Sequence, residues 1–149
     1  MMPTVLFLCS GNYYRSRFAE AYFNHRAAEL GLPHRAESRG FRLGANNFGP
    51  ISPHAAAGLQ QLGIALPSTV RFPAVVVEDE LCAAARVIAV KETEHRPLMQ
   101  QHFPALVEQV EYWQIDDIDC AEPAEALPHL QAKLDALLAG LRPATPDSA

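Results

Sequence analysis

The apolar run TVLFLC at residues 4–9 constrains the fold more than any other stretch of the chain. A short, continuous run of β-forming residues is typical of a strand that is buried on both faces of a parallel sheet. A glycine-containing loop follows, and apolar residues then recur at helical spacing over residues 15–32, where Gly31 and Pro33 mark the end of a helix. The chain therefore opens with a predicted strand, a loop and a helix.

The same alternation continues along the chain. Residues 72–85 hold an extended piece and then a short helix, and Ser52 and Pro53 are predicted as the N-cap and first residue of a longer helix. This order predicts an α/β fold, a doubly wound sheet of about four parallel strands with helices on both faces. The other predicted strands are 34–41, 86–90 and 110–115, and the other predicted long helices are 52–64, 91–103 and 124–141.

Length and composition limit the class of protein. A chain of 149 residues suits one domain, which we place at residues 1–141, with residues 142–149 as a disordered tail. The net charge of −5 argues against nucleic-acid binding, which needs a basic surface. No apolar run approaches the ~20 residues of a membrane helix. Three widely spaced cysteines without a signal peptide indicate a reducing cytoplasm rather than a disulfide framework.

The loop after the first predicted strand carries the chemistry. Ligands of doubly wound sheets bind beyond the carboxyl ends of the strands, and Cys9 stands at such an end. Backbone N–H groups at the start of the next helix attract an anion, and Gly11 and Asn12 tolerate the positive φ that turns those groups inward. Arg15 adds a planar fork for two phosphate oxygens. Cys9 is expected to be a thiolate in this field, aimed at the central atom of a bound oxyanion.

The segment VLFLCSGNYYRS resembles the phosphate-binding loop of the low-molecular-weight protein tyrosine phosphatase family, Cys-x-Gly-Asn-x-x-Arg-Ser. The segments ESRGF, SPHAAAGLQQLGI, RVIAV and YWQIDDI resemble further family segments, in the family's order, over about 140 residues. The resemblance implies a flavodoxin-like fold of the phosphotyrosine protein phosphatase I type. It also implies a protein-tyrosine-phosphatase that hydrolyses phosphotyrosine or other aryl phosphate monoesters through a phosphocysteine, without a cofactor or metal.

The resemblance also implies roles for the loop residues. Cys9 would attack phosphorus, and Arg15 with the backbone amides of residues 10–15 would hold the phosphate oxygens. Ser16 would hydrogen-bond the Cys9 thiolate and aid its departure, while Asn12 would brace the loop. The predicted phosphate- and substrate-binding residues are Ser10, Gly11, Asn12, Tyr13, Tyr14 and Arg15.

The general acid is implied by an aspartate after the fourth predicted strand. In the family this aspartate precedes a proline, whereas here Ile118 follows Asp117. Alignment on Trp113 selects Asp117, which would protonate the leaving phenol and then activate water. Asp116 and Asp119 are neighbouring alternatives.

Aromatic and basic residues near the loop are open to two interpretations. Tyr13 and Tyr14 either line the pocket for a phenyl ring or pack against the core. Tyr14 stands where many family members carry a second cysteine. Arg17 is expected to be exposed at the start of the helix. Phe41 and Phe48 are both candidates for a cleft wall from the loop after the second strand.

Two other functions compete with the phosphatase. An arsenate reductase on the same fold would need a cysteine relay, and Cys82 and Cys120 do not stand where that relay is expected. A non-catalytic phosphate- or phosphotyrosine-binding module would bind without turnover. The expected partner is a phosphotyrosine protein or a small aryl phosphate, and a monomer is the default expectation.

Overall fold

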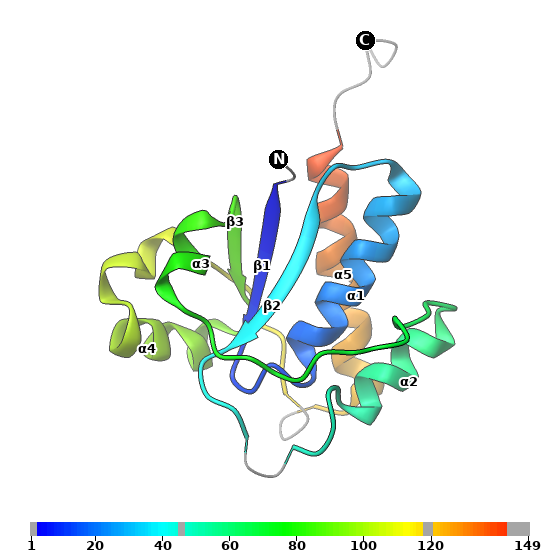
Figure 1. Ribbon diagram of the computed structural model, residues 1–149, viewed down its shortest axis with the longest axis horizontal. Helices are drawn as coiled ribbons and strands as arrows, with labels where there is room; N and C mark the ends of the chain where they lie inside the picture. The colour runs from blue at the N-terminus through cyan, green and yellow to red at the C-terminus, as the bar shows by residue number, and fades with distance from the viewer. Residues whose placement is uncertain (1–2, 45–46, 118–120, 143–149) are drawn as a thin grey trace.

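The computed structural model describes residues 3–44, 47–117 and 121–142 and contains a four-stranded parallel sheet with the strand order β2-β1-β3-β4 (Figure 1). This arrangement confirms the doubly wound α/β fold. The strands are β1 (Thr4–Cys9), β2 (Arg35–Gly40), β3 (Arg86–Ala89) and β4 (Glu111–Tyr112). The helices are α1 (Arg15–Leu30), α2 (Pro53–Gln61), α3 (Glu78–Ala83), α4 (Glu92–His102), the 3₁₀ helix η1 (Pro104–Gln109) and α5 (Pro123–Leu141).

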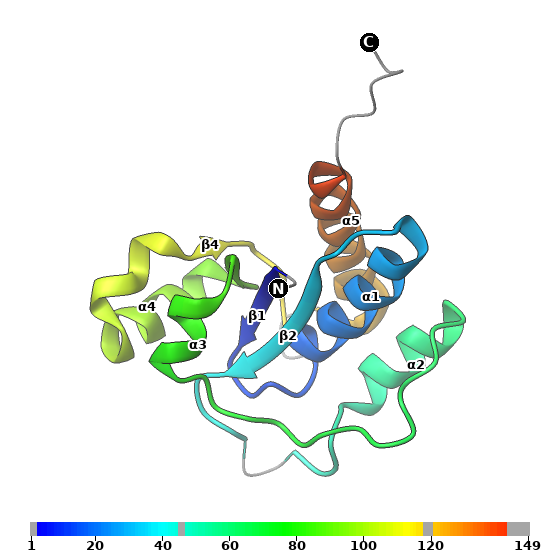
Figure 2. The same ribbon diagram turned by 45° about the horizontal axis from the view of Figure 1, so that its top comes forward.

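Helices cover both faces of the sheet, as expected. Figures 1 and 2 show α1 and α5 on one side of β1 and α3 and α4 on the other. The side chains of β1 alternate between these layers, because successive residues of a strand point to opposite faces. Val5 and Phe7 pack in the cluster that includes α1 and α5, whereas Leu6 and Leu8 pack in the cluster that includes α3 and α4.

The predicted element bounds hold closely for β1, α1 and α2. Ser52 caps α2, since its side-chain oxygen accepts a hydrogen bond from the His54 N–H at 3.1 Å, and Pro53 is the first helical residue. The strand predicted at 110–115 is shorter, at Glu111–Tyr112. Beyond it the chain still follows β3, because the Trp113 N–H donates to the Ala89 carbonyl at 2.9 Å.

The outer edge of β2 is closed by side chains and by a neighbouring segment. The Asn24 amide pairs with both backbone groups of Ala36, with distances of 2.8 and 3.1 Å. Residues 74–76 pair with Gly40, whose N–H donates to the Ala74 carbonyl at 2.8 Å. These contacts occupy backbone groups that an edge strand would otherwise leave open. They also bring residues 71–74 beside the loop that follows β1.

Parallel strands place their carboxyl ends at one edge of the sheet, which is where β1, β3 and β4 bring their following loops together. No helix among the described residues is long and apolar enough to cross a membrane. The predicted disordered tail lies outside the described residues apart from Arg142, as do Asp119 and Cys120. The assignment of residues 1–141 to one domain stays a prediction.

Candidate active site

Cys9 ends β1 and lies beneath the loop that leads into α1. Its thiol is buried, and its Sγ atom lies 2.9 Å from the Oγ atom of Ser16 in the first turn of α1. Asn12, in the loop between them, has a φ of 51°, in the left-handed region that asparagine tolerates better than most residues. The short loop therefore turns sharply enough to bring Ser16 back over Cys9.

Hydrogen bonds of the Asn12 side chain hold the cysteine side of this loop. The Asn12 Nδ2 group donates to the Oγ atoms of Ser16 and Ser38, both at 2.9 Å. The Asn12 Oδ1 atom accepts from Arg71 Nη1 and from the Ala74 N–H, both at 3.0 Å. Because Ser16 Oγ accepts a hydrogen bond from Asn12, its own hydrogen can point to the Cys9 sulfur. The predicted bracing role of Asn12 thus has a geometric basis.

Carboxylates surround Arg15, whose side chain is only 2% exposed. Its Nη1 donates to the Ile115 carbonyl at 3.0 Å, and its Nη2 lies 2.8 Å from Glu94 Oε2 and 3.3 Å from Asp117 Oδ2. Burial alone would lower the pKa of Arg15, but the nearby Cys9, Glu94 and Asp117 outweigh it and raise the pKa above its ordinary value. Arg15 is therefore a fixed cation beside the thiol.

Glu94 and His95 of α4 were missed by the sequence analysis. The Glu94 Oε2 atom accepts a hydrogen bond from Ser10 Oγ and lies 3.0 Å from His95 Nε2. The His95 Nδ1 atom accepts from the Lys91 N–H at 3.0 Å, which leaves the ring hydrogen on Nε2 to point to Glu94. The position of Glu94 in the sequence could have indicated it. Glu94 comes shortly after a predicted core strand, and the carboxyl end of that strand borders the ligand site.

The pKa values of this pair move in the same direction for different reasons. Burial favours the neutral form of Glu94, but hydrogen bonds from His95, Arg15 and Ser10 outweigh it and hold the pKa of the carboxyl well below its ordinary value. Burial lowers the pKa of His95 below 6.5, although its hydrogen bond to Glu94 opposes that shift. The favoured state is an ionised Glu94 beside a neutral His95.

A pocket of about 320 Å³ opens above Cys9 and Arg15. Asp117 lines it, whereas Asp116 pairs with Lys91 at 2.8 Å and does not line it. The structure thus places Asp117 next to the cysteine loop, and the third alternative, Asp119, is outside the described residues. The other lining residues are Gly11, Tyr13, Tyr14, Asn47, Ser52, Pro53 and His54.

Both tyrosines of the loop line the pocket, and both also make structural contacts. The Tyr13 hydroxyl donates to the Phe48 carbonyl at 2.6 Å, and the buried Tyr14 ring lies edge-on to His54 with centroids 6.3 Å apart. Burial, and then the charge of Asp117, raise the pKa of Tyr14. The two candidate phenylalanines do not line the pocket, because the Phe41 ring stacks on His95 and Phe48 is 81% exposed. The loop after β2 contributes Asn47 instead.

The expectation that Arg17 is exposed is wrong. Its side chain is 6% exposed, and its Nε atom lies 3.8 Å from Glu20 Oε1. Burial, followed by repulsion from Arg71, lowers its pKa. The segment that carries Arg71 covers this part of α1, and the sequence pattern of the helix alone did not reveal that cover. Cys82 is exposed and does not line the pocket.

No group of three or more His, Cys, Asp or Glu side chains in the described part of the chain is arranged to hold a metal ion. The arrangement around Cys9 instead combines a nucleophile, a hydroxyl donor, a fixed guanidinium and a carboxylate at the pocket wall. This set of groups can perform nucleophilic substitution at a bound oxyanion, with proton transfer by the carboxylate.

Comparison with known proteins identifies the family. The model of the low molecular weight phosphotyrosine protein phosphatase family matches residues 4–137. A low molecular weight protein tyrosine phosphatase from T. tengcongensis has 22% identity and a TM-score of 0.77, over 93% of this chain and 99% of that one. YfkJ from Bacillus subtilis has 23% identity and a TM-score of 0.81, over 94% of each chain.

The YwlE arginine phosphatase from Geobacillus stearothermophilus shares the same fold, with 21% identity and a TM-score of 0.74 over 93% of this chain and 92% of that one. No curated protein sequence shows significant similarity to the chain. The family match covers most of the chain, and Cys9, Gly11 and Arg15 of the family's loop motif line the pocket. The chain therefore belongs to the low molecular weight phosphotyrosine protein phosphatase family and is a cysteine-based phosphatase.

Proposed function

We propose that this phosphatase hydrolyses phosphotyrosine or another aryl phosphate monoester through a phosphocysteine intermediate on Cys9. The observation that carries the proposal is the position of Cys9 Sγ, 2.9 Å from Ser16 Oγ beneath a pocket that Arg15 and Asp117 also line. A phosphotyrosine protein or a small aryl phosphate is the proposed partner, and the cytoplasm is the proposed location.

The reaction has two steps in this proposal. The Cys9 thiolate attacks phosphorus, the bond from phosphorus to the aryl oxygen breaks, and Asp117 gives its proton to that oxygen. Water then attacks the phosphocysteine, Asp117 takes a proton from it, and the phosphorus–sulfur bond breaks. Phosphate leaves and the thiolate is restored, with Ser16 donating a hydrogen bond to the sulfur in its anionic state.

Arg15 holds the transferred group. A guanidinium has five N–H donors, and the Ile115 carbonyl and Glu94 occupy two of them, which fixes its orientation. The remaining donors serve the phosphate oxygens, together with the backbone N–H groups of residues 10–15. Because these donors are in place before substrate arrives, they stabilise the charge of the transition state with little reorganisation.

The pocket walls favour an aromatic leaving group. Tyr13, Tyr14, Pro53 and His54 all line the pocket. Contacts between aromatic rings contribute ~0.5–1.5 kcal/mol each beyond the area they bury. An aryl phosphate therefore gains binding energy here that an alkyl phosphate does not.

Steady-state hydrolysis of phenyl phosphate and of a phosphotyrosine peptide tests the proposal. Wild-type protein should hydrolyse both in the presence of a metal chelator, Cys9→Ser should be inactive, and Cys82→Ser should keep full activity because Cys82 is exposed on α3. Phosphoarginine and arsenate with thioredoxin are the competing substrates. Preferred turnover of either one, or full activity of Cys9→Ser, contradicts the proposal.

A further inference from the structure

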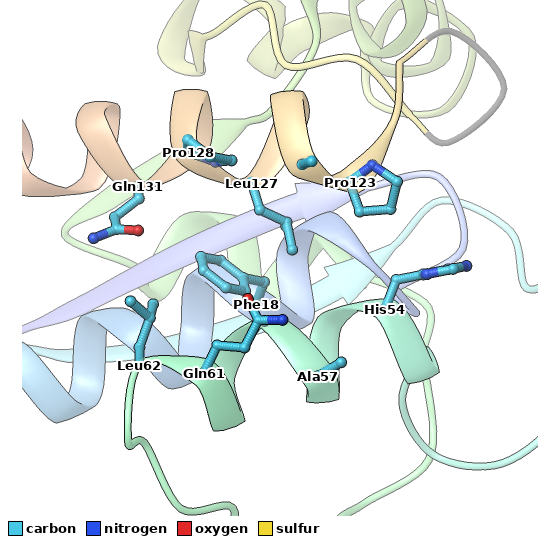
Figure 3. Close-up of a pocket in the computed structure, with 11 residues that line it drawn as sticks. Phe18, His54, Ala57, Gln61, Leu62, Pro123, Leu127, Pro128 and Gln131 are labelled. Carbon is cyan, nitrogen blue, oxygen red and sulfur yellow. The ribbon is translucent and has the colours of Figure 1, made fainter.

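A second hollow lies beside the catalytic pocket, between α2 and α5. It is a groove of about 490 Å³ whose floor includes the buried ring of Phe18, as Figure 3 shows. Ala57 of α2 and Leu62, the residue that follows α2, line one wall, and Leu127 and Pro128 line it from α5. Among the described residues that line it, none is an Asp, Glu, Lys or Arg. The groove therefore suits an apolar occupant.

The floor of the groove is firmly packed. Gly58 of α2 lies so close to the opposite wall that an added Cβ would come within 2.7 Å of Leu127 Cδ1 and 3.3 Å of Phe18 Cε2. Helix α2 can approach these side chains this closely because residue 58 is a glycine and has no Cβ atom. Since close-packed side chains resist displacement, the groove is formed before any ligand binds.

The two helices give the groove its direction. His54, Ala57 and Gln61 are spaced by three and four residues, so they lie along one face of α2, and Pro123, Leu127 and Gln131 do the same on α5. Both helices begin at the end of the groove near His54 and Pro123. Seven residues of helix rise about 10 Å. That length matches about three residues of extended peptide at roughly 3.3 Å each.

His54 joins the groove to the catalytic pocket. It lines both hollows, and its ring lies edge-on to Tyr14, whose own ring lines the catalytic pocket. A peptide chain that leaves the catalytic pocket past His54 therefore enters the groove. At the far end, the Gln61 and Gln131 amides can donate to or accept from a peptide backbone.

We propose that this groove binds an apolar side chain of a phosphoprotein substrate, within about three residues of the phosphorylated residue. The inference rests on the proposed function, because it assigns the catalytic pocket to the phosphorylated side chain. It makes the enzyme selective for protein substrates with a large apolar residue beside the phosphorylation site.

Two phosphotyrosine peptides that differ only in leucine or serine at the second and third residues from the phosphotyrosine test this inference, with each flank examined separately. Ala57→Trp and Ala124→Trp fill the groove from its two walls. Gln60→Trp is the matched control, because Gln60 is exposed on α2 and does not line the groove. The readouts are kcat and KM for each peptide and for phenyl phosphate.

On one flank, wild-type protein and Gln60→Trp should prefer the leucine peptide by about tenfold in kcat/KM, mainly through KM, since a buried leucine is worth more than one factor of ten. In both groove variants, the ratio of kcat/KM for the leucine peptide to kcat/KM for the serine peptide should approach one. Turnover of phenyl phosphate should change by less than about twofold. Equal use of the two peptides by wild-type protein, or a preference that survives in both groove variants, overturns the inference.

Binding of the labelled peptides to Cys9→Ser, measured by fluorescence anisotropy, separates the two proposals. If wild-type protein does not hydrolyse phenyl phosphate, the proposed function fails. The binding preference of Cys9→Ser for the leucine peptide over the serine peptide still tests whether the groove binds an apolar side chain. Sedimentation velocity tests whether a second copy of this chain occupies the groove instead. A dimer that Ala57→Trp disrupts and Gln60→Trp preserves would assign the groove to a second copy of this chain and overturn the inference.

Discussion

The two sides of the cysteine loop are held by different kinds of interaction. On the Cys9 side, Asn12 links the uncharged Ser16 and Ser38, and the charged group that contacts Asn12 is the Arg71 guanidinium rather than a carboxylate. On the Arg15 side, the guanidinium lies against the carboxylates of Glu94 and Asp117, at 2.8 and 3.3 Å. We call these the neutral side and the charged side of the site.

The difference follows from what each side has to hold. A carboxylate beside the Cys9 sulfur would repel the thiolate that the proposed mechanism requires, whereas the Ser16 hydroxyl can stabilise a negative sulfur without a like charge. A buried guanidinium needs nearby carboxylates, because an unpaired buried charge is costly. We therefore expect substitutions on the charged side to change catalysis most, and substitutions on the neutral side to change both stability and catalysis.

Asp117→Asn should give the largest effect. If Asp117 is the general acid, the loss of its proton should slow phenyl phosphate hydrolysis by ~10²–10⁴-fold. The loss should be smaller for nitrophenyl phosphate, whose leaving group needs less protonation. Comparing kcat on the two substrates measures this. Asp116→Asn is the matched control, because Asp116 pairs with Lys91 instead of lining the pocket. A leaving-group-dependent defect in Asp116→Asn alone would move the role to that residue.

Arg15→Lys should reduce kcat/KM by ~10²–10³-fold, the range seen when one preorganised donor to a transition state is removed. An ammonium is a point charge, so it cannot contact Ile115, Glu94 and two phosphate oxygens at once. Steady-state kinetics on phenyl phosphate measures the loss. A decrease of less than about tenfold, or ~1.4 kcal/mol, would mean that Arg15 does not clamp the phosphoryl group.

Asn12→Ala tests the neutral side. The substitution removes four hydrogen bonds and places alanine at a φ of 51°, so the free energy of unfolding should fall by about 2–4 kcal/mol. Urea unfolding measures the change. Asn12→Gly separates the two causes, because glycine relieves the backbone strain without restoring the amide. Equal losses in the two variants would show that backbone conformation contributes little here.

Replacing His95 should give the smallest effect. The direction in which it changes the pH dependence of the free energy of unfolding follows from the lowered pKa of His95. Because its folded-state pKa lies below 6.5, the unfolded chain binds the extra proton first as the pH falls. The stability that neutral His95 supports is therefore complete above about pH 6.5 and decreases below it. In His95→Asn this part of the slope should vanish, since the asparagine oxygen can accept the Lys91 N–H without titrating. Urea unfolding between about pH 5 and pH 8 measures both slopes; identical slopes would contradict the assignment.

The neutral side was largely predictable from the sequence, whereas on the charged side the motif and the resemblance indicated Arg15 and Asp117 but not Glu94. Cys9, Asn12 and Ser16 stand within eight consecutive residues, so the local sequence motif alone is enough to identify them. Glu94 reaches Arg15 across 79 positions of the chain, and no spacing rule joins them. The same limit applies to Arg71, which braces Asn12 from 59 positions away.

The same contrast between local and long-range interactions explains which elements of the fold were predicted well. Strand β1 and helix α1 match their predicted ranges, because periodicity and the Gly31 stop are local signals. Strand β4 is shorter than predicted, and the 3₁₀ helix η1 before it was not anticipated. An edge strand is defined by the neighbour it pairs with, and the apolar pattern of residues 110–115 does not state how far that pairing extends.

In the proposed mechanism, Cys9 carries the phosphoryl group between the two steps. Rapid acid quench of the Asp117→Asn variant during turnover of nitrophenyl phosphate, followed by peptide mass spectrometry, tests it most directly, because a slowed second step lets the intermediate accumulate. We expect one phosphoryl group on the peptide that contains Cys9, attached to sulfur, and none in the Cys9→Ala, Asp117→Asn double variant, because alanine offers no nucleophile. A phosphoryl group on Ser10, His54 or His95, or product burst without any covalent species, would contradict it.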